Sequence, residues 1–243
     1  MQTTLCFDFG NSRLKCAILE NSDVKNVFVL EDALRETIEK IVQQFHPQKT
    51  ILSSVIDHDA AIETFLSTNT KFHKLTSQSK LPFSTPVGKP ETIGADRLAL
   101  AAAAVELFPK QHNLVIGLGS CITYNFINKF HEFLGGSISP GLEMRFNAMH
   151  NFTAKLPLVK PDLNYPLIGY DTRTNILSGA IVGMQKEIDG VIDEYTKKFS
   201  NFNALLTGGD MPFFAPHLKN KIFANPHLIY KGLYAISEFN NLS

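Results

Sequence analysis

The stretch CFDFGNSRLKCAIL, residues 6–19, decides the fold. Apolar residues alternate with polar ones over 3–9 and 13–19, with a short bend between them, which predicts a β-hairpin. The bend gathers an acid, a glycine, an asparagine and a serine, and Lys15 follows on the second strand. Backbone N–H groups and small polar side chains at one point suit phosphate oxygens, and a nearby carboxylate suits a magnesium ion held through water.

A second stretch, NLVIGLGSCITYNFI at 113–127, repeats this arrangement of strand, glycine-containing bend and strand. When the two stretches are aligned, Gly119 falls on Gly10, Gly117 on Asp8 and Ser120 on Asn11. Either bend alone would be interpreted as an ordinary turn, since Asn and Gly are good turn formers. The repetition favours phosphate binding and predicts a duplicated fold, with the hairpins expected to face each other across a cleft and hold a triphosphate.

Composition limits the class of protein. The chain has 243 residues, 44% of them hydrophobic, and 23 basic residues balance 23 acidic ones. This balance argues against a nucleic-acid partner or an anionic membrane surface. We see no signal peptide and no stretch of membrane-spanning length. Three cysteines, Cys6, Cys16 and Cys121, lie in apolar segments without the spacing of a zinc site, so we expect them reduced and buried in a cytoplasmic protein.

Periodicity predicts the remaining elements and a division into domains at 1–110 and 111–243. The first domain should continue with a strand, a helix, a strand, a helix, a strand and a long Ala-rich helix, at 24–30, 31–45, 50–55, 57–66, 71–75 and 95–107. After the second hairpin we expect a strand, a helix, a second helix and a strand, at 132–141, 142–150, 174–198 and 203–206. Residues 211–243 should add one more helix, strand and helix.

The stretch PETIGADRLALAAAA, residues 90–104, carries a further group of polar residues at the start of a predicted helix. Asp96 there would accept a proton from an attacking hydroxyl, and Arg97 would pair with a carboxylate or phosphate. An acid in a first helical turn is also ordinary capping chemistry, and for these residues alone that interpretation is favoured. The presence of Asp8 in the same chain supports the functional one.

The ordered set of motifs resembles the type III pantothenate kinases, a branch of the acetate kinase, sugar kinase, Hsp70 and actin superfamily. The motifs run the length of the chain: DFGNSRLK at 8–15, GADR at 94–97, GLGSCIT at 117–123, GGSISPG at 135–141, TAKLP at 153–157, IGYDTRTNILSG at 168–179 and TGGD at 207–210. The resemblance implies an α/β fold of two RNase H-like domains with mixed five-stranded sheets. It also implies a homodimer that transfers the γ-phosphate of ATP to the 4′-hydroxyl of pantothenate, the first step toward coenzyme A.

The resemblance also implies roles for individual residues. The first phosphate motif would comprise Asp8, Gly10, Asn11, Ser12 and Lys15, with Asp8 near Mg²⁺. The other matched positions are Gly119, Ser120 and Thr123 for the transferred phosphate, and Thr207, Gly208 and Gly209 for the adenosine. Substrate-binding positions are Gly94, Ala95, Asp96 and Arg97, with Asp96 the general base and Arg97 on the pantothenate carboxylate, and Thr172 contributed by the partner subunit.

Three positions depart from the family pattern. Gly117 and Asn125 replace the two acids of the second phosphate motif, and Asn125 falls at a position that binds a monovalent cation, K⁺ or NH₄⁺, in relatives. Val87 replaces an aromatic residue of the pantothenate pocket. A working kinase remains the favoured function because Asp8, Lys15 and Asp96 are present. Two alternatives stay open: a non-catalytic binding or regulatory module, and a kinase of another small alcohol.

Overall fold

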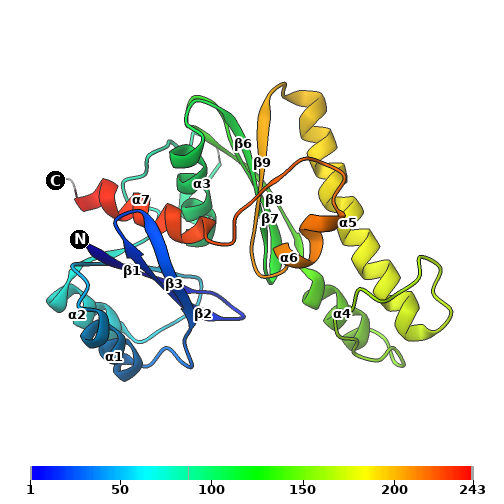
Figure 1. Cartoon of the computed structure of the whole chain (residues 1–243), viewed down its shortest axis with the longest axis horizontal. Helices are drawn as coiled ribbons and strands as arrows, with labels where there is room; N and C mark the ends of the chain where they lie inside the picture. The colour runs from blue at the N-terminus through cyan, green and yellow to red at the C-terminus, as the bar shows by residue number, and fades with distance from the viewer. Residues whose placement is uncertain (1, 87, 242–243) are drawn as a thin grey trace. The chain divides into compact units, whose positions relative to one another are not determined.

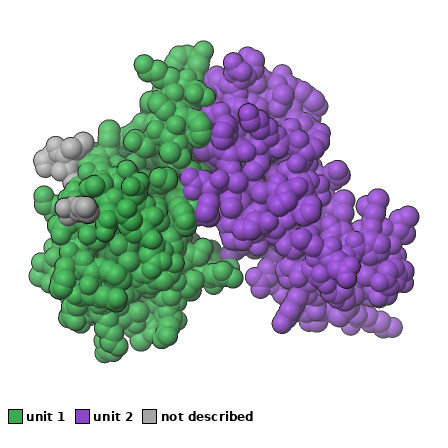
Figure 2. Space-filling view, viewed as in Figure 1, with its two compact units in different colours: residues 1–111, 125–135, 227–243 green, residues 112–124, 136–226 purple. Residues whose placement is uncertain are grey.

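The computed structural model describes residues 2–86 and 88–241, so Val87 lies outside the described residues. The chain forms two compact units (Figure 2): unit 1 comprises 1–111, 125–135 and 227–243, and unit 2 comprises 112–124 and 136–226. The predicted domains, 1–110 and 111–243, stay a prediction. The compact units change over near that boundary but assign residues 125–135 and 227–243 to unit 1.

Unit 1 is built on a five-stranded mixed sheet in the order β3-β2-β1-β4-β5 (Figure 1). Its strands are β1 (Thr3–Phe9), β2 (Leu14–Glu20), β3 (Asp23–Val29), β4 (Lys49–Ser54) and β5 (Lys71–Lys74). The predicted hairpin is confirmed, because β1 and β2 pair antiparallel with Asp8 opposite Lys15. On its other side β1 runs parallel to β4, which places Asp8 beside Ser53.

Helices cover both faces of this sheet. Leu5, Phe7 and Phe9 form one core with α1 (Arg35–Phe45) and α2 (Ala60–Asn69). Cys6 points the other way, with its Sγ 3.9 Å from the Tyr230 carbonyl oxygen of α7 (Leu228–Asn241).

The second face also carries α3 (Ala95–Leu107), which packs against α7 (Figure 1) and has a buried alanine run. Because side chains alternate along a strand, Asp8 faces the same side as Cys6, the side covered by α3 and α7.

The second sheet repeats the topology of the first, in the order β10-β9-β6-β7-β8. Its strands are β6 (His112–Leu118), β7 (Cys121–Ile127), β8 (Phe133–Pro140), β9 (Phe202–Thr207) and β10 (Phe223–Ala224). As β1 does with β4, β6 runs parallel to β9, and β9 runs parallel to β10. Two mixed five-stranded sheets of one topology confirm the predicted α/β fold and its duplication.

The helices of unit 2 are α4 (Leu142–Asn151), α5 (Thr172–Lys198) and the short α6 (Met211–Phe214). Single 3₁₀ turns occur at Pro90–Thr92 in unit 1 and Ala215–His217 in unit 2. Within 2–86 and 88–241, no helix is both long and apolar enough to cross a membrane.

Local capping explains where the observed bounds differ from those predicted. Helix α2 begins at Ala60 rather than near residue 57, because the Asp59 side chain caps it by accepting from the Ala61 N–H. Helix α5 begins two residues earlier than predicted, at Thr172, because Asp171 and Thr174 form a capping box.

The two bends differ in length, which corrects part of the alignment of the hairpins. Gly10 and Gly119 each follow directly on their strands, as aligned, but four residues separate β1 from β2 and two separate β6 from β7. Ser120 therefore does not correspond to Asn11 in the structure, although the sequence alignment pairs them. The shorter bend closes at once, with Gly119 N–H donating to the Cys121 carbonyl, whereas Gly10 N–H donates to Arg13.

Candidate active site

Asp8 stands near the end of β1, half-buried and opposite Lys15. Burial raises the pKa of its carboxyl to about 6; the positive charge of Lys15 opposes this rise and the negative charge of Asp96 adds to it. The interaction with Asp96 brings together two carboxylates that the sequence places 88 residues apart. Both lie in unit 1.

The bend after Asp8 leaves small polar residues at the surface. Asn11, Ser12 and Arg13 are exposed, and the turn is closed by the 3.2 Å hydrogen bond from Gly10 N–H to the Arg13 carbonyl. Lys15 lies half-buried on the next strand. Phosphate binding by this group of residues stays a prediction.

Asp96 lies in the first turn of α3, whose N-cap is Gly94 and whose first residue is Ala95. Burial raises the pKa of its carboxyl, although the backbone N–H groups of Arg97 and Asp96 and the charge of Arg97 oppose that rise. The side chain thus interacts with backbone N–H groups of the first turn, as the capping interpretation expects, and its role as general base stays a prediction. A partly desolvated carboxylate is a stronger base than a solvated one, which suits proton abstraction.

Arg97 is half-buried and held on two sides within unit 1. Its Nε donates to Asn125 Oδ1 at 2.6 Å, and its guanidinium carbon lies 5.6 Å from the centroid of the Phe133 ring. Asn125 is fully buried on β7. Sequence reasoning found Arg97 and Asn125 separately and missed Phe133, because their meeting depends on tertiary structure.

A magnesium ion implied by the resemblance can be tested against the groups around Asp8. Ser53, on the strand beside Asp8 and on the same face, is fully buried, and its hydroxyl oxygen has no hydrogen-bond partner among the described residues. An orphaned buried hydroxyl beside a carboxylate fits a site completed by an incoming polar group, such as the water shell of Mg²⁺. No group of three or more His, Cys, Asp or Glu side chains in the described residues could hold a metal alone.

The second bend, in unit 2, is held by Gly141, the residue that precedes α4. A Cβ on Gly141 would stand 2.2 Å from the Gly119 carbonyl oxygen, so only glycine permits this close approach. The Gly141 N–H donates to the Ser120 carbonyl. Thr123 follows on β7, half-buried. The described backbone therefore fixes the position of the predicted second phosphate motif through the turn between β8 and α4.

Glu187 of α5 gathers four elements of unit 2 on one carboxylate. The hydroxyl groups of Tyr124 on β7 and Ser139 on β8 donate to it, and Arg145 of α4 forms an ion pair with it. Arg145 Nε also donates to the Pro140 carbonyl at 2.9 Å. Burial raises the pKa of the Tyr124 hydroxyl, and the charge of Glu187 adds to that rise. Sequence reasoning missed this cluster, which links β7, β8 and α4 to α5.

The other predicted residues of unit 2 lie at strand and helix ends. Thr207 is buried at the end of β9 beside Gly117, and Gly208 has φ 104°, with the Leu118 carbonyl oxygen 2.1 Å from where a Cβ would be. Gly209 is exposed in the same turn. Thr172 is exposed in the first turn of α5.

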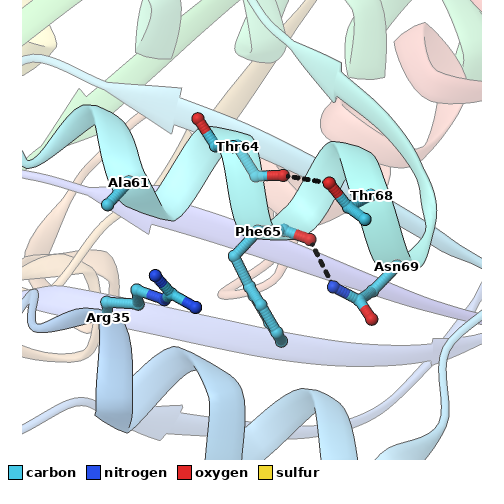
Figure 3. Close-up of a pocket in the computed structure, with 6 residues that line it drawn as sticks. All are labelled: Arg35, Ala61, Thr64, Phe65, Thr68 and Asn69. Atoms are coloured by element: carbon cyan, nitrogen blue, oxygen red, sulfur yellow. Dashed lines mark hydrogen bonds between the residues drawn. The ribbon is translucent and has the colours of Figure 1, made fainter.

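Unit 1 has a surface hollow between α1 and α2 (Figure 3). Arg35 on its rim pairs with Glu39 and lies over the Phe65 ring, and the polar side chains of Thr68 and Asn69 bond to carbonyls of their own helix. Its polar groups are thus occupied, and none of the predicted site residues lines it.

The model of one protein family, described as type III pantothenate kinase, matches residues 4–194. The chain belongs to the type III pantothenate kinase family. A type III pantothenate kinase of Flavobacterium johnsoniae is 44% identical over 94% of this chain and 95% of that protein. One of Cytophaga hutchinsonii is 39% identical over 97% of this chain and 99% of its own length.

Solved structures agree on the fold. A Campylobacter jejuni protein, named as a Baf family transcriptional activator, matches with a TM-score of 0.61 at 22% identity, over 97% of this chain and 98% of that one. The ethanolamine utilization protein EutJ of Carboxydothermus hydrogenoformans matches with a TM-score of 0.51 at 12% identity, over 98% of this chain and 90% of that one. At these identities the matches support the fold alone.

Proposed function

We propose that this member of the family phosphorylates pantothenate at its 4′-hydroxyl with ATP, the first step of coenzyme A biosynthesis. The observation that carries the proposal is the group of charged residues in unit 1, where Asp8 interacts with both Lys15 and Asp96, and Asp96 interacts with Arg97. Two acids and two bases of this kind supply a phosphate-binding charge, a proton acceptor and an anion-binding group.

Each of these residues has a distinct part in the reaction. Lys15 and the bend after Asp8 bind phosphate oxygens, and Arg97 binds the pantothenate carboxylate. The Asp96 carboxylate takes the proton of the 4′-hydroxyl. At the same time the hydroxyl oxygen bonds to the γ-phosphorus of ATP, and the bond between that phosphorus and the ADP oxygen breaks. Mg²⁺, when held at Asp8, supplies charge neutralisation for the phosphates.

The predicted residues of unit 2 contribute neutral donors. We assign Gly119, Ser120 and Thr123 to the transferred phosphate and the Thr207–Gly209 turn to the nucleotide. The tight packing of Gly141 against the bend and the positive φ of Gly208 support preorganised backbone at both turns. A rigid, uncharged loop positions phosphate without adding negative charge.

We further propose that the active form is a homodimer in the cytoplasm. The surface of β8, α4 and the segment before α5 exposes a run of large apolar side chains: Ile138, Met144, Phe152, Leu167, Ile168 and Tyr170, of which Phe152 and Ile168 are 88% and 86% exposed. So much exposed apolar surface favours burial by a partner. Thr172 follows the last of these residues, Tyr170, by two positions in the sequence. The three cysteines are free, with Cys6 and Cys16 buried and Cys121 half-buried, which suits a reducing compartment.

A test of the dimer uses Ile168→Glu, which places a charge on this surface. Light scattering should give the mass of a dimer for wild type and of a monomer for the variant, with pantothenate turnover lost or its KM raised at least tenfold. Lys160→Glu, an exposed charge change in the same segment, is the control. A monomeric wild type with full activity would contradict the proposal.

The substrate is tested by an acceptor screen. Purified enzyme with ATP and Mg²⁺ is offered pantothenate, pantetheine, glycerol and small sugars, and ADP release is followed. Pantothenate should give the highest kcat/KM, and phosphorus NMR should show a new phosphomonoester. Preference for another alcohol would support a kinase with a different acceptor, and binding of ATP and pantothenate without turnover would support a binding module.

A further inference from the structure

Three polar groups on the α3 and α7 side of the first sheet lack hydrogen-bond partners. The Ser53 hydroxyl is fully buried and unpartnered in the part of the chain that the structure describes. Among the same residues, neither the Asp8 carboxylate nor the Tyr230 hydroxyl forms a hydrogen bond, and Lys15 forms no ion pair with Asp8. Buried polar groups in folded proteins are nearly always hydrogen-bonded, so three unpartnered ones in one place indicate a ligand that completes them.

Strand pairing places the first two groups side by side. β1 runs parallel to β4, and Asp8 is the Cα partner of Ser53. Partners on neighbouring strands point to the same face of a sheet, and the strands are about 4.8 Å apart. The carboxylate and the hydroxyl therefore face the same space on the α7 side of the sheet.

The course of α7 brings the third group to this place. The Tyr230 carbonyl oxygen lies 3.9 Å from Cys6 Sγ, and Glu238, later on the helix, pairs with Lys49 at the start of β4. α7 therefore runs antiparallel to β1 and β4. Helix side chains lean toward the N-terminus of their helix, so the Tyr230 ring extends past Cys6 toward Asp8. Burial raises the pKa of the Tyr230 hydroxyl, and the negative charge of Asp8 adds to that rise.

The chemistry of the three groups selects the class of ligand. Each presents oxygen atoms that accept hydrogen bonds, and one of the groups is a carboxylate. A ligand that satisfies them brings O–H or N–H donors and a positive charge. A magnesium ion that keeps several of its water molecules has both properties. Direct ligation by side chains does not fit, because no group of three or more His, Cys, Asp or Glu side chains in the described residues could hold a metal.

We propose that Ser53 and Tyr230 are binding residues for the magnesium ion of the nucleotide, and that their hydroxyls, together with Asp8, bind its water molecules. This inference rests on the proposed function, because ATP brings the ion to the site. Neither residue belongs to a motif found in the sequence. An unpartnered buried hydroxyl destabilises the ligand-free chain, so Ser53 should lower stability there and contribute only on binding.

The experiment measures binding and needs no turnover. NMR titration gives the Kd of adenylyl imidodiphosphate, a non-hydrolysable ATP analogue, once with Mg²⁺ and once with EDTA in place of the metal. The ratio of the Kd with EDTA to the Kd with Mg²⁺ is the magnesium gain. It is compared among wild type, Ser53→Ala and Tyr230→Phe, each of which removes a single oxygen atom.

Each variant has a matched control. Thr4→Val removes another fully buried, unpartnered hydroxyl of the same sheet face. Thr4 lies four residues before Asp8 on β1, about 13 Å away at the rise of a strand. Tyr234→Phe removes the hydroxyl of the tyrosine one turn after Tyr230, whose pKa is raised by burial and by the charges of Glu238 and Cys6.

The magnesium gain should fall about three- to tenfold in Ser53→Ala and in Tyr230→Phe, the scale of one hydrogen bond, with the Kd in EDTA within about twofold of wild type. Thr4→Val and Tyr234→Phe should keep the wild-type gain. Without ligand, the thermal midpoint of Ser53→Ala should equal or exceed that of wild type, because an unsatisfied group has been removed. A purely structural hydroxyl would lower the midpoint and leave the gain unchanged.

An unchanged gain in Ser53→Ala and Tyr230→Phe, an equal loss in the two controls, or a wild type that binds the analogue no better with Mg²⁺ would overturn the inference. If one variant does not fold by circular dichroism, the other decides the result. Pantothenate turnover by wild type together with an unchanged gain in the variants would leave the kinase and end the inference. A gain lost in both variants of a wild type that phosphorylates no pantothenate would end the proposed function and uphold the inference.

Discussion

The same position in the two sheets carries opposite chemistry. In unit 1, Asp8 on β1 lies beside Ser53 on β4, and in unit 2, Gly117 on β6 lies beside Thr207 on β9. The first pair combines a half-buried carboxylate with an orphaned hydroxyl, and the second combines a glycine with a buried threonine. The duplicated fold therefore has a glycine-containing bend in each copy but an acid at this position in the first copy alone.

This difference indicates that the two copies of the fold have different properties: charged groups in unit 1 and a tightly packed, uncharged bend in unit 2. Unit 1 contains the charged residues Asp8, Lys15, Asp96 and Arg97. Burial raises the carboxyl pKa of Asp8 and of Asp96 and lowers the guanidinium pKa of Arg97. In unit 2, the charged cluster described above is the Glu187 network, which joins β7, β8, α4 and α5. We infer that chemistry depends on the first copy and positioning on the second.

Replacing the proposed base, Asp96 of unit 1, should reduce activity more than any other change. Asp96→Asn keeps the size of the side chain and removes its basicity, so kcat should fall about 10³-fold, within the range for general-base residues. The pantothenate KM should change little, and light scattering and thermal unfolding should match wild type. Activity above about one tenth of wild type would remove Asp96 from the mechanism.

Asp8→Asn should reduce activity and increase stability. Burial raises the carboxyl pKa from 3.8 to about 6, so the folded state binds a proton more tightly than the unfolded chain. Stability from this group is fully present below pH 3.8 and is lost as pH rises through about 6. At pH 7.5 without ligands the variant should be more stable by about 1–3 kcal/mol, while kcat falls at least about 100-fold.

Urea unfolding from pH 4 to pH 8 measures this effect. The difference between wild type and Asp8→Asn should be near zero at the acid end and largest above pH 6.5. Asp23→Asn, an exposed acid in β3, serves as the control and should show no such trend. A variant less stable than wild type at pH 7.5 would mean that Asp8 is a structural residue.

Loosening the second bend tests the positioning half of the comparison. Glu187→Gln keeps the shape but removes the charge that pairs with Arg145, so the ATP KM should rise about tenfold and the free energy of unfolding should fall by about 1–2 kcal/mol. Steady-state kinetics and chemical denaturation measure the two effects. Glu143→Gln, an exposed acid of α4, should change neither. A purely structural Glu187 would lower stability and leave the ATP KM unchanged.

Restoring the missing acid should have the smallest effect. Gly117→Asp returns a carboxylate to β6, and we expect kcat within about threefold of wild type, less than 1 kcal/mol of barrier. Gly117→Ala separates the effect of the added Cβ from that of the charge. A rise of about 100-fold in kcat would show that the wild-type bend lacks a required group.

The sequence predicts the fold because the dominant signals are local. Two-residue alternation located the hairpins, and α3 was predicted at its observed bounds, 95–107. Asp8 and Asp96 were found because each stands in a recognisable motif. Cap residues decided the starts of α2 and α5, and the alternation of apolar residues does not reveal which polar residue will cap.

The parts that sequence did not predict depend on contacts between distant residues. Glu187 meets Tyr124, Ser139 and Arg145 only after α4 and α5 have packed. Asn125 was recognised as a departure from the family, but its partner Arg97 lies 28 residues earlier on another element. The difference in length between the two bends was also not predicted. The first glycines of the bends align, and the two extra residues of the first bend carry no periodic signal.

The measurement that tests the account most directly is phosphorus NMR of wild-type enzyme with ATP, Mg²⁺ and pantothenate. The account predicts that ADP and a phosphomonoester of pantothenate accumulate in equal amounts. A folded protein that binds both ligands and forms no phosphomonoester would contradict it, because the acid kept in the first copy would then be insufficient without the one lost from the second.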